Sequence, residues 1–441
     1  MTSDPDQRSS PSGIRLLSPL RDFLHTETSG AALLIVGALA ALLWANSPWS
    51  ATYEQFWATV SEISVGSWSL HLSLRHLVND GLMAVFFFVV GLEIKRELTT
   101  GHLTTKRQLL RPAAAALGGM AVPALVYLAI AGRTAFHGWA VPVATDIALA
   151  LGVLALAGSA VSASMRAFML GLAIIDDIGA IIIIAVVYST GVSGRYLVLA
   201  LLAVVAAVIL RRVGVRALPV YVCLATLAWY WLYRGGIHPT LAGVAMGLLV
   251  PSEAHVPPEF VDIEELEDLS TVQAARATSA IARDSVSEVE WLQHVLHPWT
   301  SFVIVPIFAL ANSGVEVTGA GLRHLLTSAL AWGIIAGLVL GKPLGVLIAV
   351  ALARRAAATT STAESDLAPA DEASNEHTFG QTLGLGAAAG IGFTIALFIT
   401  DLAFQDPAQR ADAKLAVLIA SVVAGIAALM ILRSQRPEVN D

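Results

Sequence analysis

The chain has 441 residues, of which 56% are hydrophobic and only 13% are charged, and its formal net charge is −7. Soluble proteins carry about 25% charged and 45–50% apolar residues, so this composition excludes a soluble enzyme and a disordered chain and indicates a membrane protein. The acidic balance leaves no basic surface for nucleic acid, and the single cysteine, Cys223, excludes an internal disulfide.

Long apolar runs predict membrane-spanning helices, each of which needs about 20 mostly apolar residues. A polar N-terminal tail over residues 1–27 comes first, a polytopic all-α domain follows over 28–433, and a second tail covers 434–441. The twelve predicted spans are 30–49, 76–94, 112–131, 139–157, 167–187, 196–210, 217–233, 237–250, 298–312, 326–353, 382–404 and 415–432.

The distribution of lysine and arginine predicts the orientation. With both termini in the cytoplasm, the cytoplasmic segments hold 18 of the 26 basic residues and the outer segments hold 7, while Lys342 lies inside a span. Membrane proteins carry this excess of positive charge on the cytoplasmic side. We therefore expect a multi-pass protein of the cell inner membrane whose two tails are both cytoplasmic.

Three polar segments interrupt the spans. Residues 50–75 include an alternating run over 63–70, which predicts a short outer hairpin. Residues 251–293 form an acidic cytoplasmic loop, and residues 356–380 form a cytoplasmic linker rich in Ala, Ser, Thr and Glu; both are interpreted as solvated connections. Because an exposed hairpin edge can pair with that of a second copy, the hairpin suggests a homodimer.

Four ionisable residues lie in the middle of predicted spans, namely Asp146, Asp176, Asp177 and Lys342. A charge at the bilayer centre costs about 2.5–3.5 kcal/mol, so it persists where it has a partner or a function. One interpretation is a structural ion pair that holds two helices together. Three carboxylates and one lysine do not balance, however, so the excess charge must be protonated or matched by a bound cation. This imbalance favours a transport site.

The two neighbouring aspartates cannot share one partner. Adjacent residues of a helix point about 100° apart, so Asp176 and Asp177 face different groups. A carboxylate in this position can exchange a proton for a hard cation, whose natural ligands are oxygens, and Lys342 is a candidate counter-ion. The divergence argues against an intramembrane aspartyl protease, which needs two carboxylates that face one bond. A channel is a third alternative, although no segment resembles a selectivity filter.

Two predicted spans contain helix-breaking residues. Pro142 precedes Asp146 in one span, and Gly386, Gly390 and Gly392 lie close together in another. Interrupted helices at corresponding places in two halves of a chain are typical of a transporter binding site. The alternative is that the glycines serve close packing between helices.

Nine short motifs follow one another between residues 20 and 433, and together they resemble those of the NhaA-type Na⁺/H⁺ antiporter family. They are 78–87 (VNDGLMAVFF), 91–97 (GLEIKRE), 144–148 (ATDIA), 173–177 (AIIDD), 241–243 (LAG), 294–299 (HVLHPW), 308–312 (FALAN), 341–345 (GKPLG) and 390–394 (GIGFT).

The resemblance implies inverted repeats with two broken helices that cross near the bilayer midplane. It implies that Asp177 is the principal carboxylate for Na⁺ and protons, with Asp176 as its partner in holding Na⁺ and paired with Lys342 in one protonation state. Asp146 and Thr145 match the positions at the helix break, where the carboxylate compensates the positive helix ends.

The resemblance also implies the activity, which is export of Na⁺ or Li⁺ in exchange for two protons, electrogenic and regulated by pH, without a cofactor. The lipid bilayer, sodium and protons are then the partners. Glu93, Glu97, His238 and His294 resemble positions tied to pH regulation, and their alternative role is to cap the ends of spans. Pro239 and the long acidic loop depart from the family pattern.

Overall fold

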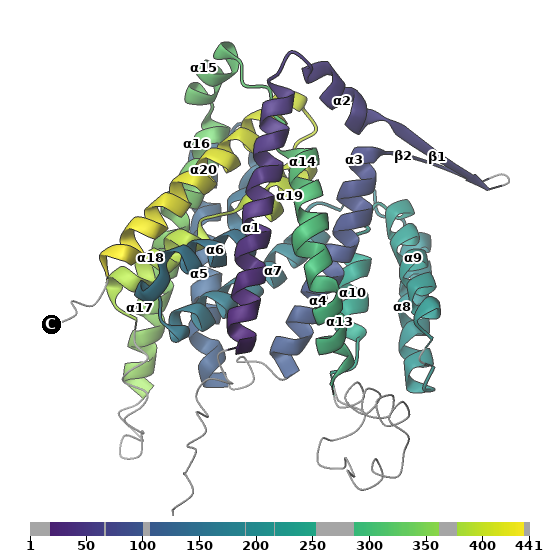
Figure 1. Ribbon diagram of the computed structural model, residues 1–441, viewed down its shortest axis with the longest axis horizontal. Helices are drawn as coiled ribbons and strands as arrows, with labels where there is room; N and C mark the ends of the chain where they lie inside the picture. The colour runs from purple at the N-terminus through teal and green to yellow at the C-terminus, as the bar shows by residue number, and fades with distance from the viewer. Residues whose placement is uncertain are drawn as a thin grey trace, which may run out of the picture.

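Helices occupy all twelve predicted spans in the computed structural model of the chain (Figure 1). The structure describes residues 18–65, 68–99, 106–189, 191–215, 217–252, 286–360 and 377–435. The first 17 residues of the N-terminal tail, most of the acidic loop and the linker, and the end of the C-terminal tail therefore lie outside the described residues.

The first eight spans precede the acidic segment. They are α1 (Ser18–Ala45), the continuous α3, η1 and α4 (Leu74–His76, Leu77–Leu82 and Met83–Thr99), α5 (Lys106–Ala131), η2 with α6 (Phe136–Val143 and Ile147–Ala157), α7 (Ala163–Val187), α8 (Gly194–Arg212), α9 (Leu218–Arg234) and α10 (Leu241–Leu249).

The last four spans follow the acidic segment. They are α13, η5 and α14 (Glu288–Trp299, Thr300–Ile304 and Val305–Asn312), α16, η6 and α17 (Ala329–Ala336, Gly337–Gly341 and Lys342–Thr360), α18 with α19 (Phe379–Ala389 and Phe393–Ala403) and α20 (Pro407–Ser434). Two short helices, α2 (Ser50–Ala58) and α15 (Gly319–Thr327), lie between spans.

Within the described ranges, nine helices are long and apolar enough to cross a membrane, or ten if the bent pair of α18 and α19 is one span. The prediction of a helical multi-span membrane protein is confirmed. With 17 and 9 residues, α9 and α10 are the two predicted spans that are too short for this test. The number of twelve spans therefore stays a prediction.

Several boundaries differ from those predicted. The helix that contains Pro298 begins at Glu288, ten residues before the predicted start, because the side chain of Ser287 accepts a hydrogen bond from the backbone N–H of Glu290 and caps it there. The end of the predicted acidic loop is thus helical. Similarly, α1 begins inside the predicted N-terminal tail, and α17 continues to Thr360 inside the predicted linker.

A hairpin projects from one end of the helices (Figure 1). Strands β1 (Val60–Val65) and β2 (Trp68–Ser73) pair antiparallel, with Val60 opposite Ser73. The described residues of the alternating run, 63–65 and 68–70, lie in these strands, whereas the start of the predicted outer segment forms α2.

Tyr53 anchors α2 to the end of α14. Its hydroxyl lies 2.9 Å from the carbonyl oxygens of both Leu310 and Ala311, and it accepts a hydrogen bond from the backbone N–H of Gly314. Burial raises the pKa of Tyr53 to about 12. The base of the hairpin is therefore held to the helix bundle by a buried polar contact.

Candidate functional site

Two interrupted helices meet at the centre of the fold. The chain leaves the helical conformation over 144–146 between η2 and α6, and again over 390–392, where α18 and α19 are bent by 48°. The backbone N–H of Asp146 donates to the carbonyl oxygen of Ile391 at 2.6 Å, so the two breaks contact each other directly. These are the two places where proline and glycine predict interruptions.

The local sequence explains both breaks. Pro142 has no N–H to continue a helical ladder. A Cβ at Gly390 would overlap the carbonyl oxygen of Leu338, and one at Gly392 would lie 3.1 Å from that of Ala144. The glycines therefore allow the break and the close approach of neighbouring backbones, so the two interpretations of these residues are compatible.

Asp146 joins the two helices that start at the breaks. Its Oδ1 accepts from the backbone N–H of Leu149 at 3.0 Å and caps α6. Its Oδ2 accepts from the backbone N–H of Thr394 at 3.0 Å and from its hydroxyl at 2.7 Å, in the first turn of α19. Because helix N-termini carry partial positive charge, one carboxylate stabilises two helix ends that would otherwise repel each other.

Lys342 and Asp176 form a fully buried ion pair. The lysine Nζ lies 2.6 Å from Oδ2 of Asp176, both side chains have an exposed fraction of 0%, and Nζ also donates to the carbonyl oxygen of Val143. The Thr145 hydroxyl lies 2.6 Å from the same carboxylate oxygen and 2.9 Å from the carbonyl oxygen of Ala389. Lysine and threonine thus connect α7 to both helix breaks.

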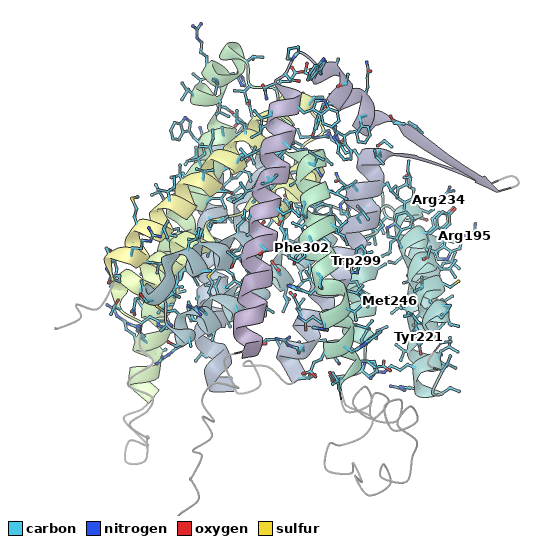
Figure 2. The ribbon with its side chains drawn as sticks, viewed as in Figure 1. Arg195, Tyr221, Arg234, Met246, Trp299 and Phe302 are labelled. Atoms are coloured by element: carbon cyan, nitrogen blue, oxygen red, sulfur yellow. The ribbon has the colours of Figure 1, made fainter. Side chains whose placement is uncertain are left out.

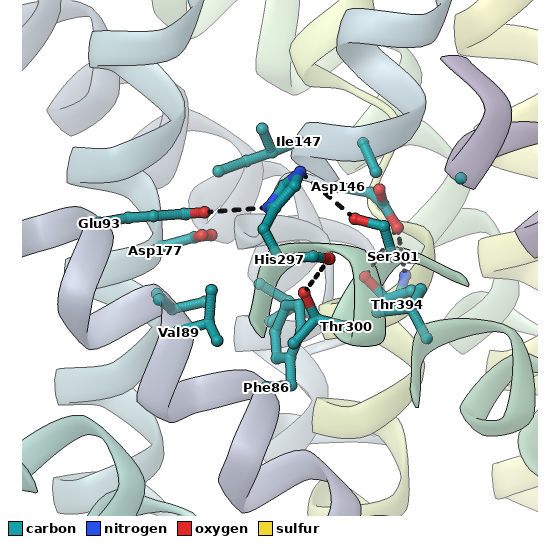
Figure 3. Close-up of a pocket in the computed structure, with 15 residues that line it drawn as sticks. Phe86, Val89, Glu93, Asp146, Ile147, Asp177, His297, Thr300, Ser301 and Thr394 are labelled. Atoms are coloured by element: carbon teal, nitrogen blue, oxygen red, sulfur yellow. Dashed lines mark hydrogen bonds and ion pairs between the residues drawn. The ribbon is translucent and has the colours of Figure 1, made fainter. Parts of the chain in front are cut away.

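Asp177 takes no part in this ion pair and lines a cavity of about 70 Å³ (Figure 3). Its carboxylate makes no hydrogen bond or ion pair with the described part of the chain, and its Oδ1 is buried. Since a water molecule takes up about 30 Å³ in the liquid, the cavity has room for about two waters or a small, partly hydrated ion. Asp146 also lines this cavity, whereas Asp176 does not.

Four other polar residues that line the cavity did not emerge as candidates from the sequence. Thr300 and Ser301 come from the π-helical segment η5, a type of helix that is frequent at functional sites, and Thr394 comes from α19. His297 places its Nδ1 3.9 Å from Oε1 of Glu93 and its Nε2 3.5 Å from the hydroxyl of Ser301 (Figure 3). The cavity therefore offers hydroxyls, an imidazole and carboxylates.

The four residues considered for pH regulation do not form one cluster. Glu93 lines both the cavity of Asp177 and a smaller one of about 30 Å³, and the buried Glu97 lines the smaller cavity. His294 is exposed and lines neither, because the side chain that faces Glu93 is His297, one turn further along the helix. His238 lines a third cavity, of about 400 Å³. Its Nε2 lies 3.0 Å from the carbonyl oxygen of Tyr188, and among the described residues it forms no hydrogen bond with a carboxylate.

This arrangement is suited to binding a proton or a small cation. One buried carboxylate faces a small cavity with hydroxyl ligands beside it, while its two acidic neighbours are engaged by helix ends and by a lysine. Among the described residues, no three His, Cys, Asp or Glu side chains converge as they would at a tightly held metal ion.

Comparison with known proteins identifies the family. The sequence profile of the family described as Na⁺/H⁺ antiporter 1 matches residues 21–432. The chain is 45% identical to the Na⁺/H⁺ antiporter NhaA 2 of Myxococcus xanthus, over 94% of this chain and 89% of that one. It is 42% identical to the Na⁺/H⁺ antiporter NhaA of Rhodopirellula baltica, over 95% and 94%, and 41% identical to NhaA 3 of Frankia alni, over 96% and 90%.

The predicted family is thereby confirmed. The protease alternative is excluded, since this is a family of transporters and not of enzymes. The chain belongs to the NhaA family of Na⁺/H⁺ antiporters.

Proposed function

We propose that the protein exports Na⁺ or Li⁺ in exchange for protons and that Asp177 binds both. The observation that carries this proposal is the contrast among the three site aspartates. Asp146 is held by two helix ends and Asp176 by a lysine, whereas Asp177 faces the cavity without a hydrogen bond or ion pair to the described residues. A buried carboxylate of this kind must take up a proton or a cation to balance its charge.

The neighbouring residues have supporting roles in this proposal. Once Asp176 has separated from Lys342, it joins Asp177 in holding the cation. Thr145, whose hydroxyl contacts both Asp176 and the helix break, moves together with Asp176. Asp146 keeps the two helix ends together and presents one edge of its carboxylate to the cavity. Hard cations prefer such oxygen ligands, and both aspartates are within one turn of the same helix.

Competition for the same carboxylates couples the two fluxes. The site faces alternately one side of the membrane and the other as one repeat moves against the other. If it changes sides only when it holds a cation or protons, neither ion crosses without exchange for the other. We propose two protons for each cation, held at Asp177 and at the Asp176–Lys342 pair, so that each cycle moves net charge. An exchange of this stoichiometry is electrogenic.

Regulation by pH involves Glu93 and Glu97 in this proposal. Both lie on α4: Glu93 lines the cavity of Asp177, and Glu97 lines the smaller cavity, which shares Glu93 with it. His238 and His294 lie outside these two cavities. Their effects on pH dependence are therefore expected to be indirect.

The proposed orientation places both termini in the cytoplasm of a twelve-span protein, in two inverted repeats, in the cell inner membrane. Arg195 and Arg234, predicted to be outside, lie at the end of α8 and α9 that is nearer the hairpin (Figure 2). The predicted cytoplasmic ends of α13 and α17 lie at the opposite end (Figure 1). The hairpin is then external, where it is available for pairing with a second copy.

The test measures dissipation of a pH gradient in inverted membrane vesicles after addition of Na⁺, Li⁺ or K⁺. We expect a response to Na⁺ and Li⁺ but not to K⁺, and we expect Asp177→Asn to abolish it because asparagine keeps the shape and removes both charge and proton. Asp412→Asn is the matched control, since Asp412 pairs with His324 at 2.9 Å away from all three cavities.

Two results would contradict the proposal. Exchange at the parental rate by an inserted, folded Asp177→Asn protein would remove Asp177 from the centre of the mechanism. A vesicle response to K⁺ equal to that for Na⁺ would contradict the proposed substrate.

A further inference from the structure

Helix α19 connects the cavity of Asp177 with the 400 Å³ cavity at the hairpin end. Its first turn supplies Thr394 and Ile395 to the cavity of Asp177. Its later turns supply Phe398, Asp401 and Leu402 to the larger one. Because an 11-residue helix is a stiff element, a displacement at one end of α19 moves the other end as well.

An aromatic layer separates the two cavities. The ring of Phe398, which is 1% exposed, has its centroid 5.7 Å from that of Phe87 on α4 and 6.4 Å from that of Phe308 on α14. In this conformation the route from Asp177 toward the hairpin end is thus closed by packed side chains.

A polar cluster lies on the outer side of this layer and holds the end of α19. Oδ1 of Asp401 lies 2.8 Å from Nζ of Lys414 and 3.6 Å from Nε of Arg410, both on α20. A carboxylate in the last turn of a helix is unfavourable next to the negative end of the helix dipole. Nearby cations offset this effect, and the lysine is itself largely buried.

Two asparagines connect this carboxylate to the other side of the route. Nδ2 of Asn312 donates to Oδ1 of Asn79 at 2.7 Å, and Nδ2 of Asn79 lies 3.2 Å from Oδ1 of Asn312. Nδ2 of Asn79 also lies 3.4 Å from Oδ2 of Asp401. The π-helical segment η1, which carries Asn79, and α14 are thereby bonded to α19.

We propose that Asn79, Asn312, Asp401 and Lys414 form an outer lock that holds the route shut on the hairpin side while Asp177 is open to the opposite side. The proposal rests on the transport function proposed above. Asp401 is then a positioning residue, which acts on the site through α19. At the other end of this helix Thr394 binds Asp146, so movement of α19 changes the lock and the site together.

The other charged groups at the lock are compatible with this role. Arg75 and Asp80 line the same cavity as Asn79, Asp401 and Lys414. Opening separates the asparagine pair on η1 and α14 from the carboxylate on α19, and the large cavity allows water to replace the lost hydrogen bonds. A two-state element with replaceable polar contacts is a suitable gate.

The test measures the rate at which a membrane-impermeant thiol reagent labels Ser301→Cys in a Cys223→Ala background. Ser301 lines the cavity of Asp177, so a reagent added on the hairpin side reaches it when the lock is open. We expect Asp401→Asn and Asn79→Ala each to raise this rate about tenfold, which is within the usual range for coupled conformational changes. Asp412→Asn on α20 is the matched control and should leave the rate unchanged.

Three further arms separate a lock from a structural contact. Labelling from the opposite side should slow or stay constant in both lock variants, whereas a generally loosened protein would be labelled faster from both sides. Lys414→Met, which leaves Asp401 only its longer contact with Arg410 on α20, should also raise the rate on the hairpin side. If Asp401→Asn does not insert, Asn79→Ala carries the test alone, because it leaves no buried charge without a partner.

The outcomes also distinguish the lock from the transport function. Parental labelling rates in both lock variants, with Na⁺-dependent exchange present, would overturn the lock and leave the proposed function intact. Faster labelling of the lock variants on the hairpin side, together with no Na⁺-dependent exchange by the parental protein itself, would support the lock and overturn the proposed function.

Discussion

The buried pair of Lys342 and Asp176 is the interaction whose removal has the most readily derived effect. Lys342→Met keeps most of the side-chain volume and removes the charge. The lost contact is a 2.6 Å ion pair whose partners are both fully buried. At this separation an effective dielectric constant of 20 gives a Coulomb attraction of about 6 kcal/mol, but the lysine no longer has to be desolvated, which offsets part of the loss.

The net effect is the free energy of leaving Asp176 buried without its cation. Breaking one member of a buried pair typically destabilises a soluble protein by about 3–5 kcal/mol, and membrane proteins tend toward smaller values. Because the hydroxyl of Thr145 still contacts the carboxylate at 2.6 Å, we expect the low end, about 3 kcal/mol. The double variant Lys342→Met with Asp176→Asn should recover about 2 kcal/mol, since no charge is left without a partner.

Thermal unfolding in detergent of the parent, the Lys342→Met and Asp176→Asn single variants and the double variant measures this double-mutant cycle. The control is Lys414→Met, which also removes a largely buried lysine from an ion pair. Lys414 lies on α20, and its partner Asp401 is at the end of α19 that is far from the site. Its loss of stability should not be recovered by Asp176→Asn. The reasoning would be refuted by a Lys342→Met protein that melts with the parent, or by a double variant that melts no higher than the single one.

Three other predictions concern the helix break, the contact of Tyr53 with α14, and the acidic loop. Thr394→Val removes one of the two hydrogen bonds from α19 to Asp146, so the apparent KM for Na⁺ in vesicles should rise about tenfold; an unchanged KM would argue against a role at the site. The phenol of Tyr53 has its pKa raised from 10.0 to about 12, so its contribution to stability is complete below pH 10 and is lost as the pH rises to about 12. Melting temperatures measured across this range should fall less steeply in Tyr53→Phe, and equal slopes would contradict the assignment. Deletion of 259–285 should leave exchange intact, because Val289 N–H donates to the carbonyl oxygen of Pro251 at 3.2 Å and so holds the flanks of the loop together; complete loss of exchange in a correctly inserted deletion would contradict the linker interpretation.

The charged residues of the site were predictable because charge is costly in a membrane. Each of the four intramembrane charges lies at the crossing of the broken helices or beside it. The mid-span positions by themselves left open which aspartate meets Lys342, since that depends on how η6 and α17 pack against α5, and only the family resemblance implied Asp176. Gly118 of α5 and Gly345 of α17 lie against each other, and α5 also packs against α7, which carries Asp176.

The polar neutral residues of the site were not predictable in the same way. Hydroxyls such as those of Thr300, Ser301 and Thr394 occur in membrane helices at little cost, so their presence gives no signal. The π-helical segment η5 also changes the angular position of the residues after Trp299, which a regular helical period does not anticipate. His294 and His297 both lie in the regular helix α13, before η5, and of the two only His297 faces the cavity.

The charge imbalance seen in the sequence is concentrated on one residue by the fold. Two helix N-termini neutralise Asp146, and a lysine that also binds the end of η2 neutralises Asp176. Releasing either compensation exposes a helix end or a buried ammonium, so in the proposed cycle the Asp176–Lys342 pair changes only together with a proton or the cation. Asp177 has no such compensation from the described residues, and a proton or a cation is the only remaining way to balance its charge. In the proposed mechanism a proton on Asp177 removes the charge that attracts a cation, so exchange would follow from the same imbalance that reveals the site.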